Sequence, residues 1–238
     1  MTKAKAVARV RKHGKKYVEK AALVDRTKQY TVAEASDLVT KVSTTKFDAS
    51  VEVHFNIVAD TTQADQLVRT TVSLPHGTGK KIRIAAFVPD DQADAAIKAG
   101  ADIAGMSTLL PEVEKENIDF DVAVAIPTVM KDLGKVAKIL GQRGMMPNPK
   151  AGTVTQDISK AIAELKKGRI ECKMDKDGNI HAIFGKVSFG ASKLQENLET
   201  ILNAIKEARP AGIKGDYIRS VTVCPSMGPG VKVSLLQS

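Results

Sequence analysis

Cysteine and aromatic residues are scarce in this sequence of 238 residues. It contains two cysteines, Cys172 and Cys224, and no C-x-x-C pair. This spacing excludes a disulfide scaffold and a cysteine-rich zinc site, and we expect a protein of a reducing cytoplasm. Tryptophan is absent, and aromatic residues make up only 4% of the chain. A protein that stacks the bases of single-stranded nucleic acid on an aromatic platform is therefore disfavoured.

Long apolar runs are missing as well. No run approaches the roughly 18 residues that a membrane-spanning helix requires, so we expect no membrane partner. The N-terminal segment is basic but has no apolar core, and we therefore expect no secretory signal. Hydrophobic residues at 43% and charged residues at 26% are typical of a globular protein. The length suggests one or two domains.

Motifs of common enzymes are absent or incomplete. The four histidines form no H-x-x-x-H or H-E-x-x-H pattern, and no G-x-S-x-G turn is present. Gly77–Lys81 resembles the end of a phosphate loop, but the upstream glycine is missing and Lys81 replaces the usual Ser or Thr. We expect no enzyme, no cofactor and no metal. The rival hypothesis is a nucleotide-dependent enzyme, although Phe87–Asp90 does not supply the required glycine-rich turn.

Positive charge is in excess and is concentrated near the N-terminus. The chain has 36 basic and 27 acidic residues, a net charge of +9. Residues 1–30 hold ten of the basic and two of the acidic residues, a net charge of +8. Such a basic arm indicates contact with a polyanion, because lysine and arginine beside phosphates release counterions. A solvated tail that aids solubility is the alternative. With so few aromatics, an RNA-binding chain would read shape, phosphates and ribose hydroxyls.

Residues 78–168 alternate between short apolar runs and helical patterns. Apolar runs at Lys81–Val88, 101–105 and Asp121–Pro127 are typical of strands buried on both faces. The remaining segments predict helices at Asp90–Gly100, partly within 107–117, at Asp132–Gly141 and at Asp157–Lys167. Strands of this kind separated by helices predict parallel βαβ units in a three-layer arrangement.

The two ends of the chain follow a period of two instead. In Val51–Val58, Arg169–Lys173 and Ile218–Val223, apolar and polar residues alternate, which predicts strands with one buried and one open face. Asp177-Gly178 predicts a hairpin turn between Ile170–Met174 and Ile180–Phe184, rather than a calcium loop, because the final glutamate is missing. The patterns Thr31-x-x-Glu34 and Ser192-x-x-Gln195 predict capping boxes at the start of two covering helices.

Neither end has enough strands and helices for a good core by itself. We therefore predict a discontinuous two-layer α+β domain, residues 1–77 and 169–238, with an inserted three-layer α/β, Rossmann-like domain, residues 78–168. The chain passes between the two domains twice. These two crossings carry Gly77, Gly79 and Gly168, which predicts a hinge. The alternative is a large interface that locks the two domains together.

Three loops are too unusual for generic connections: Leu74–Lys81, Ile139–Thr155 and Ser220–Gly230. The second places two cations among glycines and prolines, which favours a stiff loop that contacts phosphate or sugar. The third places a hydroxyl, a flexible apolar side chain and a glycine in a tight turn, a combination that fits a shallow RNA minor groove. Ordinary structural connections are the alternative for both.

These three segments, in this order and spacing, resemble the bacterial ribosomal protein L-one family of the large subunit. The resemblance runs from the basic N-terminus through TTKFDASVEVHFN to the final SMGPGVKVS, and the run ILGQRGMMPNPKAGTVT is highly specific. It implies a protein that binds large-subunit ribosomal RNA and forms the mobile stalk near the tRNA exit site. It also implies release of deacylated exit-site tRNA, repression of its own operon through the mRNA leader, a cytoplasmic, ribosome-bound location, and a monomer when free.

The resemblance further implies which residues bind RNA. In the split domain these are Lys46, Phe47, Glu52, His181, Lys186, Ser220, Ser226, Met227 and Gly228. Arg143 and Lys150 are implied as secondary RNA or tRNA contacts. The strand patterns agree independently, because Glu52 and Ser220 fall on the open faces of their strands. We expect the acidic Glu52 to accept from a ribose hydroxyl or to position Lys46.

Two positions depart from the usual family pattern. Gln142 stands where proline is usual, and we expect a less rigid loop there. Ser226 stands where threonine is usual, which keeps the hydroxyl and removes a methyl group. The sequence does not rank ribosomal RNA binding against translational repression, because the two differ in RNA target and not in protein chemistry.

Overall fold

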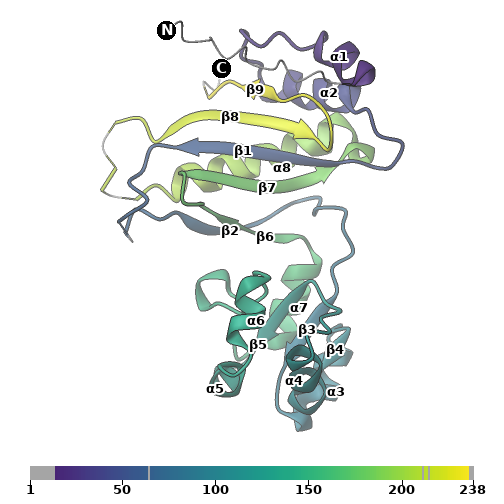
Figure 1. Ribbon diagram of the computed structural model, residues 1–238, viewed down its shortest axis with the longest axis vertical. Helices are drawn as coiled ribbons and strands as arrows, with labels where there is room; N and C mark the ends of the chain where they lie inside the picture. Colours follow the sequence, from purple (N-terminus) through teal and green to yellow (C-terminus); the bar gives the residue numbers. More distant parts are fainter. Residues whose placement is uncertain (1–13, 64, 211, 214, 236–238) are drawn as a thin grey trace, which may run out of the picture.

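The computed structural model describes residues 14–63, 65–210, 212–213 and 215–235. Residues 1–13 of the predicted basic arm, with five of its ten basic residues, lie outside the described residues. Figure 1 shows a four-stranded sheet at one end of the long axis and a three-stranded sheet with its helices at the other end. A short two-stranded sheet lies between them.

The four-stranded antiparallel sheet combines strands from both ends of the chain, in the order β7-β1-β8-β9. Its strands are β1 (Ser50–Ile57), β7 (Asn179–Lys186), β8 (Ile218–Pro225) and β9 (Val231–Val233). Every second residue of β1 is buried, as the period of two predicted. The buried side chains pack on α2 (Val32–Val42) and α8 (Gly190–Glu207), and α8 runs behind the sheet in Figure 1. Helix α1 (Lys15–Ala21) precedes α2.

Helix α2 begins as its capping box predicts. The Thr31 hydroxyl accepts from the Glu34 amide at 3.3 Å, and the Glu34 carboxylate accepts from the Thr31 amide at 3.0 Å. The second capping box is wrong. Helix α8 begins at Gly190, so Ser192 lies within its first turn and no side chain caps it. The 3₁₀ turn η4 (Val187–Phe189) leads directly into the helix, whose N-cap is Phe189, three residues before Ser192.

The ends do not form one sheet. The predicted turn at Asp177-Gly178 is present, but the predicted pairing of Ile170–Met174 with Ile180–Phe184 is wrong beyond Met174 and Ile180. Strand β6 (Arg169–Lys173) pairs along its whole length with β2 (Arg69–Ser73) as a separate antiparallel sheet. Beyond β6, Met174 forms an antiparallel bridge with Ile180, and the Asp175 amide donates to the Asn179 carbonyl at 2.8 Å across the turn. The Asp175 carboxylate accepts from the amides of Asp177 and Asn179, which makes this a tight turn between two different sheets.

The middle of the chain forms a parallel sheet with helices on both faces. Its strands are β3 (Ile84–Phe87), β4 (Ile103–Ala104) and β5 (Val122–Ala125), in the order β4-β3-β5. Helices α3 (Ala93–Lys98) and α7 (Ile158–Lys166) pack on one face. Helices α4 (Met106–Glu114), α5 (Met130–Leu133) and α6 (Ala137–Gln142) pack on the other. The 3₁₀ turns η1 (Asp90–Gln92), η2 (Pro127–Val129) and η3 (Pro149–Ala151) lie in connections.

The prediction of one continuous helix at Asp132–Gly141 is wrong. Two short helices, α5 and α6, take its place, with Gly134 at the end of the first. The predicted fold class holds in its coarser form, a mixed α/β chain with several sheets. The buried apolar residues around the four-stranded sheet come from residues 24–74 and 172–233, whereas those of the parallel sheet come from residues 84–165.

Candidate nucleic-acid interface

The solvent-facing side of the four-stranded sheet, called here the open face, carries polar side chains in register. On β1 these are Ser50, Glu52, His54 and Asn56, which alternate with buried residues. Three cross-strand rows result: Ile183–Glu52–Cys224, His181–His54–Thr222 and Asn179–Asn56–Ser220. Since the helices cover the other side, these rows remain accessible to a ligand.

Ser50 joins two predicted site residues at one end of the open face. Its hydroxyl accepts a hydrogen bond from Lys186 Nζ at 2.9 Å, and its carbonyl accepts from the Ser226 amide at 2.9 Å. Lys186 Nζ also donates to the carbonyl of Asp48 at 3.3 Å. A lysine ammonium has three donors, so these contacts fix its direction and leave capacity for a ligand. The sequence reasoning did not single out Ser50, although it lies within the segment TTKFDASVEVHFN.

The turn between β8 and β9 presents Met227 to solvent. Its side chain is 78% exposed, and its backbone lies in the left-handed region at a φ of 63°. The Gly228 amide closes the turn by donating to the Pro225 carbonyl at 2.9 Å. A Cβ on Gly228 would come within 2.5 Å of the Pro225 ring, so this position requires glycine. The structure places an exposed apolar side chain in a strained turn, as at many binding sites.

Lys46 and Phe47 lie in the loop that leads into β1. Phe47 is 63% exposed, and its carbonyl accepts from the Thr45 hydroxyl at 2.9 Å. The neighbouring Asp48 carboxylate accepts from the amide and the hydroxyl of Ser188. These bonds tie the loop to the end of β7, beside Lys186. Asp48 and Ser188 are thus supporting residues that sequence reasoning missed.

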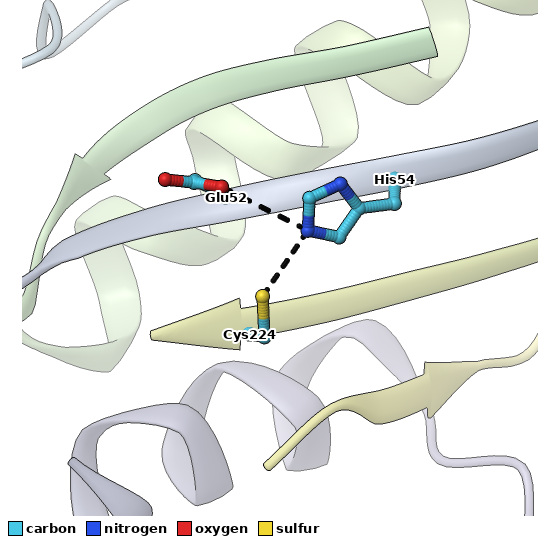
Figure 2. Close-up of side chains that lie close together, drawn as sticks. All are labelled: Glu52, His54 and Cys224. Atoms are coloured by element: carbon cyan, nitrogen blue, oxygen red, sulfur yellow. Dashed lines mark hydrogen bonds and ion pairs between the residues drawn. The ribbon is translucent and has the colours of Figure 1, made fainter. Parts of the chain in front are cut away.

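Glu52, His54, His181 and Cys224 meet in the middle of the open face. Figure 2 shows Glu52 and His54 on β1 with Cys224 beside them on β8. His54 Nε2 lies 3.1 Å from Cys224 Sγ and 3.9 Å from Glu52 Oε2, and His54 Nδ1 lies 2.8 Å from His181 Nδ1. Glu52 thus contacts His54, whereas the sequence suggested that Glu52 accepts from a ribose hydroxyl or positions Lys46.

Burial shifts the pKa values of two groups in this cluster. Partial burial lowers the pKa of His54, and His181 lowers it further, while Glu52 opposes them. Burial raises the pKa of the Cys224 thiol, and the charge of Glu52 adds to the effect. Both shifts favour the neutral forms. The Glu52, His54 and Cys224 ligand atoms all lie within 4.8 Å of one another, close enough to hold a metal ion.

Ser220 lies at the far end of the open face. It is exposed and stands opposite Asn56, whose side-chain amide donates to Asn179 Oδ1 at 2.9 Å. The nine residues implied for RNA binding in the split domain therefore all lie on the open face or on the loops at its edge. They form a stripe along the sheet.

Arg143 and Lys150 lie apart from this stripe. Arg143 follows α6 in the middle of the chain, and its guanidinium donates to the Glu116 carbonyl at 3.3 Å. The side chain of Lys150 lies outside the described residues. The same loop packs Met145 and Met146 against the core and adds Val154 as a bridge to Ala125 of β5. The loop thus packs against the core of the parallel sheet, and the prediction that Arg143 and Lys150 contact RNA or tRNA stays a prediction.

Gly77, Gly79 and Gly168 all have positive φ values, 65°, 73° and 99°. A Cβ on Gly168 would lie 2.3 Å from the Gly77 Cα, so the two chain crossings run in direct contact. The buried side chain of Asn197 on α8 donates to the carbonyls of Gly77 and Phe184 and accepts from the His76 amide. Each crossing therefore needs glycine, and α8 anchors one of them.

Comparison with known proteins decides the family. Residues 39–229 match the Ribosomal protein L1p/L10e family. The chain belongs to this family. It is 49% identical to the large ribosomal subunit protein uL1 of Thermosipho melanesiensis, over 94% of this chain and 97% of that protein. The same protein of Thermosipho africanus is 49% identical over 93% and 96%, and that of Chloroflexus aggregans is 50% identical over 94% and 96%.

Family membership confirms the resemblance and its coarser consequences. The chain is a ribosomal protein of the large subunit and not an enzyme. The expected location on the ribosome in the cytoplasm agrees with these relatives. Among the described residues, no helix has both the length and the apolar character needed to cross a bilayer.

Proposed function

We propose that the open face binds large-subunit ribosomal RNA. The observation that carries this proposal is the stripe itself, in which all nine implied residues share one accessible surface. Lys186 supplies a fixed positive charge, Ser220 and Ser226 supply hydroxyls, and Met227 supplies an exposed apolar contact. RNA recognised through its minor groove offers phosphates, ribose hydroxyls and base edges to this combination.

The experiment is a binding titration with a labelled fragment of the ribosomal stalk RNA and a scrambled duplex, from about 50 to 200 mM salt. We expect tight binding of the fragment at the high end of this range, where the duplex is lost. Equal and steeply salt-dependent binding of both RNAs would contradict the proposal, since the basic arm would then act alone.

Lys186→Gln provides a sharper test of the surface. Removing one phosphate contact should weaken binding of the fragment and reduce the slope of log K against log salt by about one. Lys98→Gln is the matched control, because Lys98 is exposed on α3, away from the sheet, and the variant loses the same charge. Equal effects of the two variants would contradict a role for the open face.

The finer functions implied by the family use both parts of the chain. The split unit holds the RNA, and residues 78–168 turn about Gly77, Gly79 and Gly168 and use Arg143 and Lys150 for secondary contacts, including exit-site tRNA. Separate cores on the two sides of the crossings support independent movement. Fluorescent labels on β7 and α4 would report a distance that changes on tRNA binding, and an unchanged distance would contradict the hinge.

For repression of its own operon, the protein would bind the mRNA leader with the open face. An mRNA that presents the same shape must compete with ribosomal RNA, because both need the same residues. We expect the leader and the stalk fragment to exclude each other from a single monomer. Simultaneous binding of both RNAs would contradict this part of the proposal.

A further inference from the structure

The cluster in the middle of the open face has the chemistry of a metal site. Glu52 and His54 lie two residues apart on β1, and Cys224 faces Glu52 across the sheet on β8. A carboxylate, an imidazole and a thiol are ligands that zinc accepts in proteins. Strand pairing alone brings them together, from positions 170 residues apart between His54 and Cys224.

The distances are close to those of a tetrahedral zinc site. Bonds of about 2.3 Å to sulfur and about 2.0 Å to nitrogen place these two atoms about 3.5 Å apart. His54 Nε2 and Cys224 Sγ are 3.1 Å apart, and Glu52 Oε2 is 3.9 Å from the same nitrogen. The Glu52 and Cys224 ligand atoms lie within 4.8 Å of each other, so the Glu52 carboxylate must move toward both partners to complete the site. The partly exposed Glu52 side chain can make such a shift by rotation about its own bonds.

Contacts on the other side of the His54 ring favour the tautomer whose Nε2 is free to bind a metal ion. His54 Nδ1 is 2.8 Å from His181 Nδ1, and His181 Nε2 is 3.5 Å from the Asp175 carboxylate. If His181 keeps its proton on Nε2, facing Asp175, its Nδ1 accepts the proton of His54 Nδ1. His54 Nε2 then carries a lone pair directed at Cys224 and Glu52. An acceptor behind a ligating histidine fixes its tautomer and ring orientation, and here His181 takes that place with the Asp175 carboxylate behind it.

We propose that Glu52, His54 and Cys224 bind one zinc ion, with a fourth coordination position open to solvent on the open face. Binding displaces the proton of the Cys224 thiol to solvent, and zinc forms bonds to the thiolate sulfur, His54 Nε2 and a Glu52 oxygen. The fourth position takes water or another oxygen ligand. This inference concerns the free protein and does not depend on RNA binding.

Cobalt(II) titration of the reduced full-length protein, followed by displacement with zinc, tests the site. We expect one equivalent of cobalt to give thiolate-to-cobalt charge-transfer absorption, and zinc to abolish it. Cys224→Ser should remove the absorption and weaken zinc binding by more than about 100-fold. Cys172→Ala is the matched control, because Cys172 is fully buried in the core and should leave the absorption unchanged.

His181→Gln separates positioning from structure. We expect zinc affinity to fall by about 10–100-fold, while the charge-transfer absorption is retained at saturating cobalt and the melting temperature of the metal-free protein is unchanged. Absence of the absorption in the parent protein, or its persistence in Cys224→Ser, would overturn the proposal. Because Cys224 is half-buried and serine is nearly isosteric, thermal melting can verify that this variant is folded.

Discussion

Met227 combines two properties that a structural residue rarely has. It is the most exposed large apolar side chain among the described residues, and it occupies a left-handed backbone conformation. Both properties are unfavourable for the free protein, since the side chain gains little burial and a β-carbon is strained at this φ. A contact with a ligand would explain why methionine is used at this position.

Met227→Gly should therefore separate binding from stability. We expect RNA affinity to fall by about 1–3 kcal/mol, as for a good specific contact, because the apolar side chain is lost. Stability should stay constant or rise slightly, since glycine accepts a φ of 63° without strain. Filter binding and urea unfolding measure the two quantities. A folded variant that binds as tightly as the parent would refute the assignment.

At the scale of elements, buried polar bonds join the first chain crossing to the four-stranded sheet. Asn197 is fully buried on α8 and bonds to three backbone groups in the crossing and in β7. The sequence did not reveal this role, because Asn197 falls among the apolar positions of the helix. An amide fits there because it supplies donors and an acceptor to backbone groups that lack strand partners.

Asn197→Ala should destabilise the protein by about 2–4 kcal/mol, since it leaves the buried carbonyl of Phe184 and the partly buried carbonyl of Gly77 without this donor. Urea unfolding monitored by circular dichroism measures the change. Asn203→Ala is the matched control, because Asn203 lies on the exposed side of the same helix and its loss should cost less than about 1 kcal/mol. Equal costs would contradict the anchoring role.

A second polar connection lies at the start of the parallel sheet. Asp121 accepts from Lys80 Nζ at 2.8 Å and from the Arg83 amide at 3.0 Å. The Lys80 bond, followed by the Arg83 amide, lowers the pKa of Asp121. A carboxylate whose pKa is lower in the folded state stabilises the fold above its unfolded pKa, and the contribution disappears as pH falls through the folded pKa.

Asp121→Asn should thus be destabilised by about 1 kcal/mol near neutral pH. The difference between variant and parent should shrink as the pH falls below about 4, where Asp121 takes up a proton. Urea unfolding of both proteins across this pH range gives the comparison. If the difference in unfolding free energy did not change with pH, the charge of Asp121 would not be what stabilises the fold.

At the scale of the whole molecule, the contact between the crossings has a further consequence. Gly77 and Gly168 lie against each other, and strands β2 and β6 pair on the side of the split unit. Among the described residues, the core of the four-stranded sheet contains none from 78–168. If this segment is deleted, the chain ends at Gly77 and Gly168 can therefore be joined with little rearrangement.

Replacing residues 78–167 by a short glycine linker should leave a folded, cooperative unit that binds the stalk RNA fragment within about tenfold of the parent affinity. Loss of the tRNA contact is expected at the same time. Chemical denaturation and RNA titration of the shortened chain provide the measurements. If the shortened chain were unfolded, the two parts would share stability, and the proposed domain division would be wrong.

Much of the fold follows from local patterns in the sequence. The period of two in Val51–Val58, the Thr31–Glu34 capping box and the apolar runs of the middle segment all predict what the structure contains. These features depend on residues within a few positions of each other, so the sequence expresses them directly. The family was also determined at this level, because the long loop segments are specific.

Only the tertiary structure decided which strands pair and which side chains meet. Strand β6 joins β2 across about 100 residues instead of the adjacent β7, since a local turn signal does not specify a partner. The Ser50 contacts with Lys186 and Ser226, and the group of Glu52, His54 and Cys224, likewise arise from strand register. Register sets the geometry of the open face, and no sequence spacing encodes it.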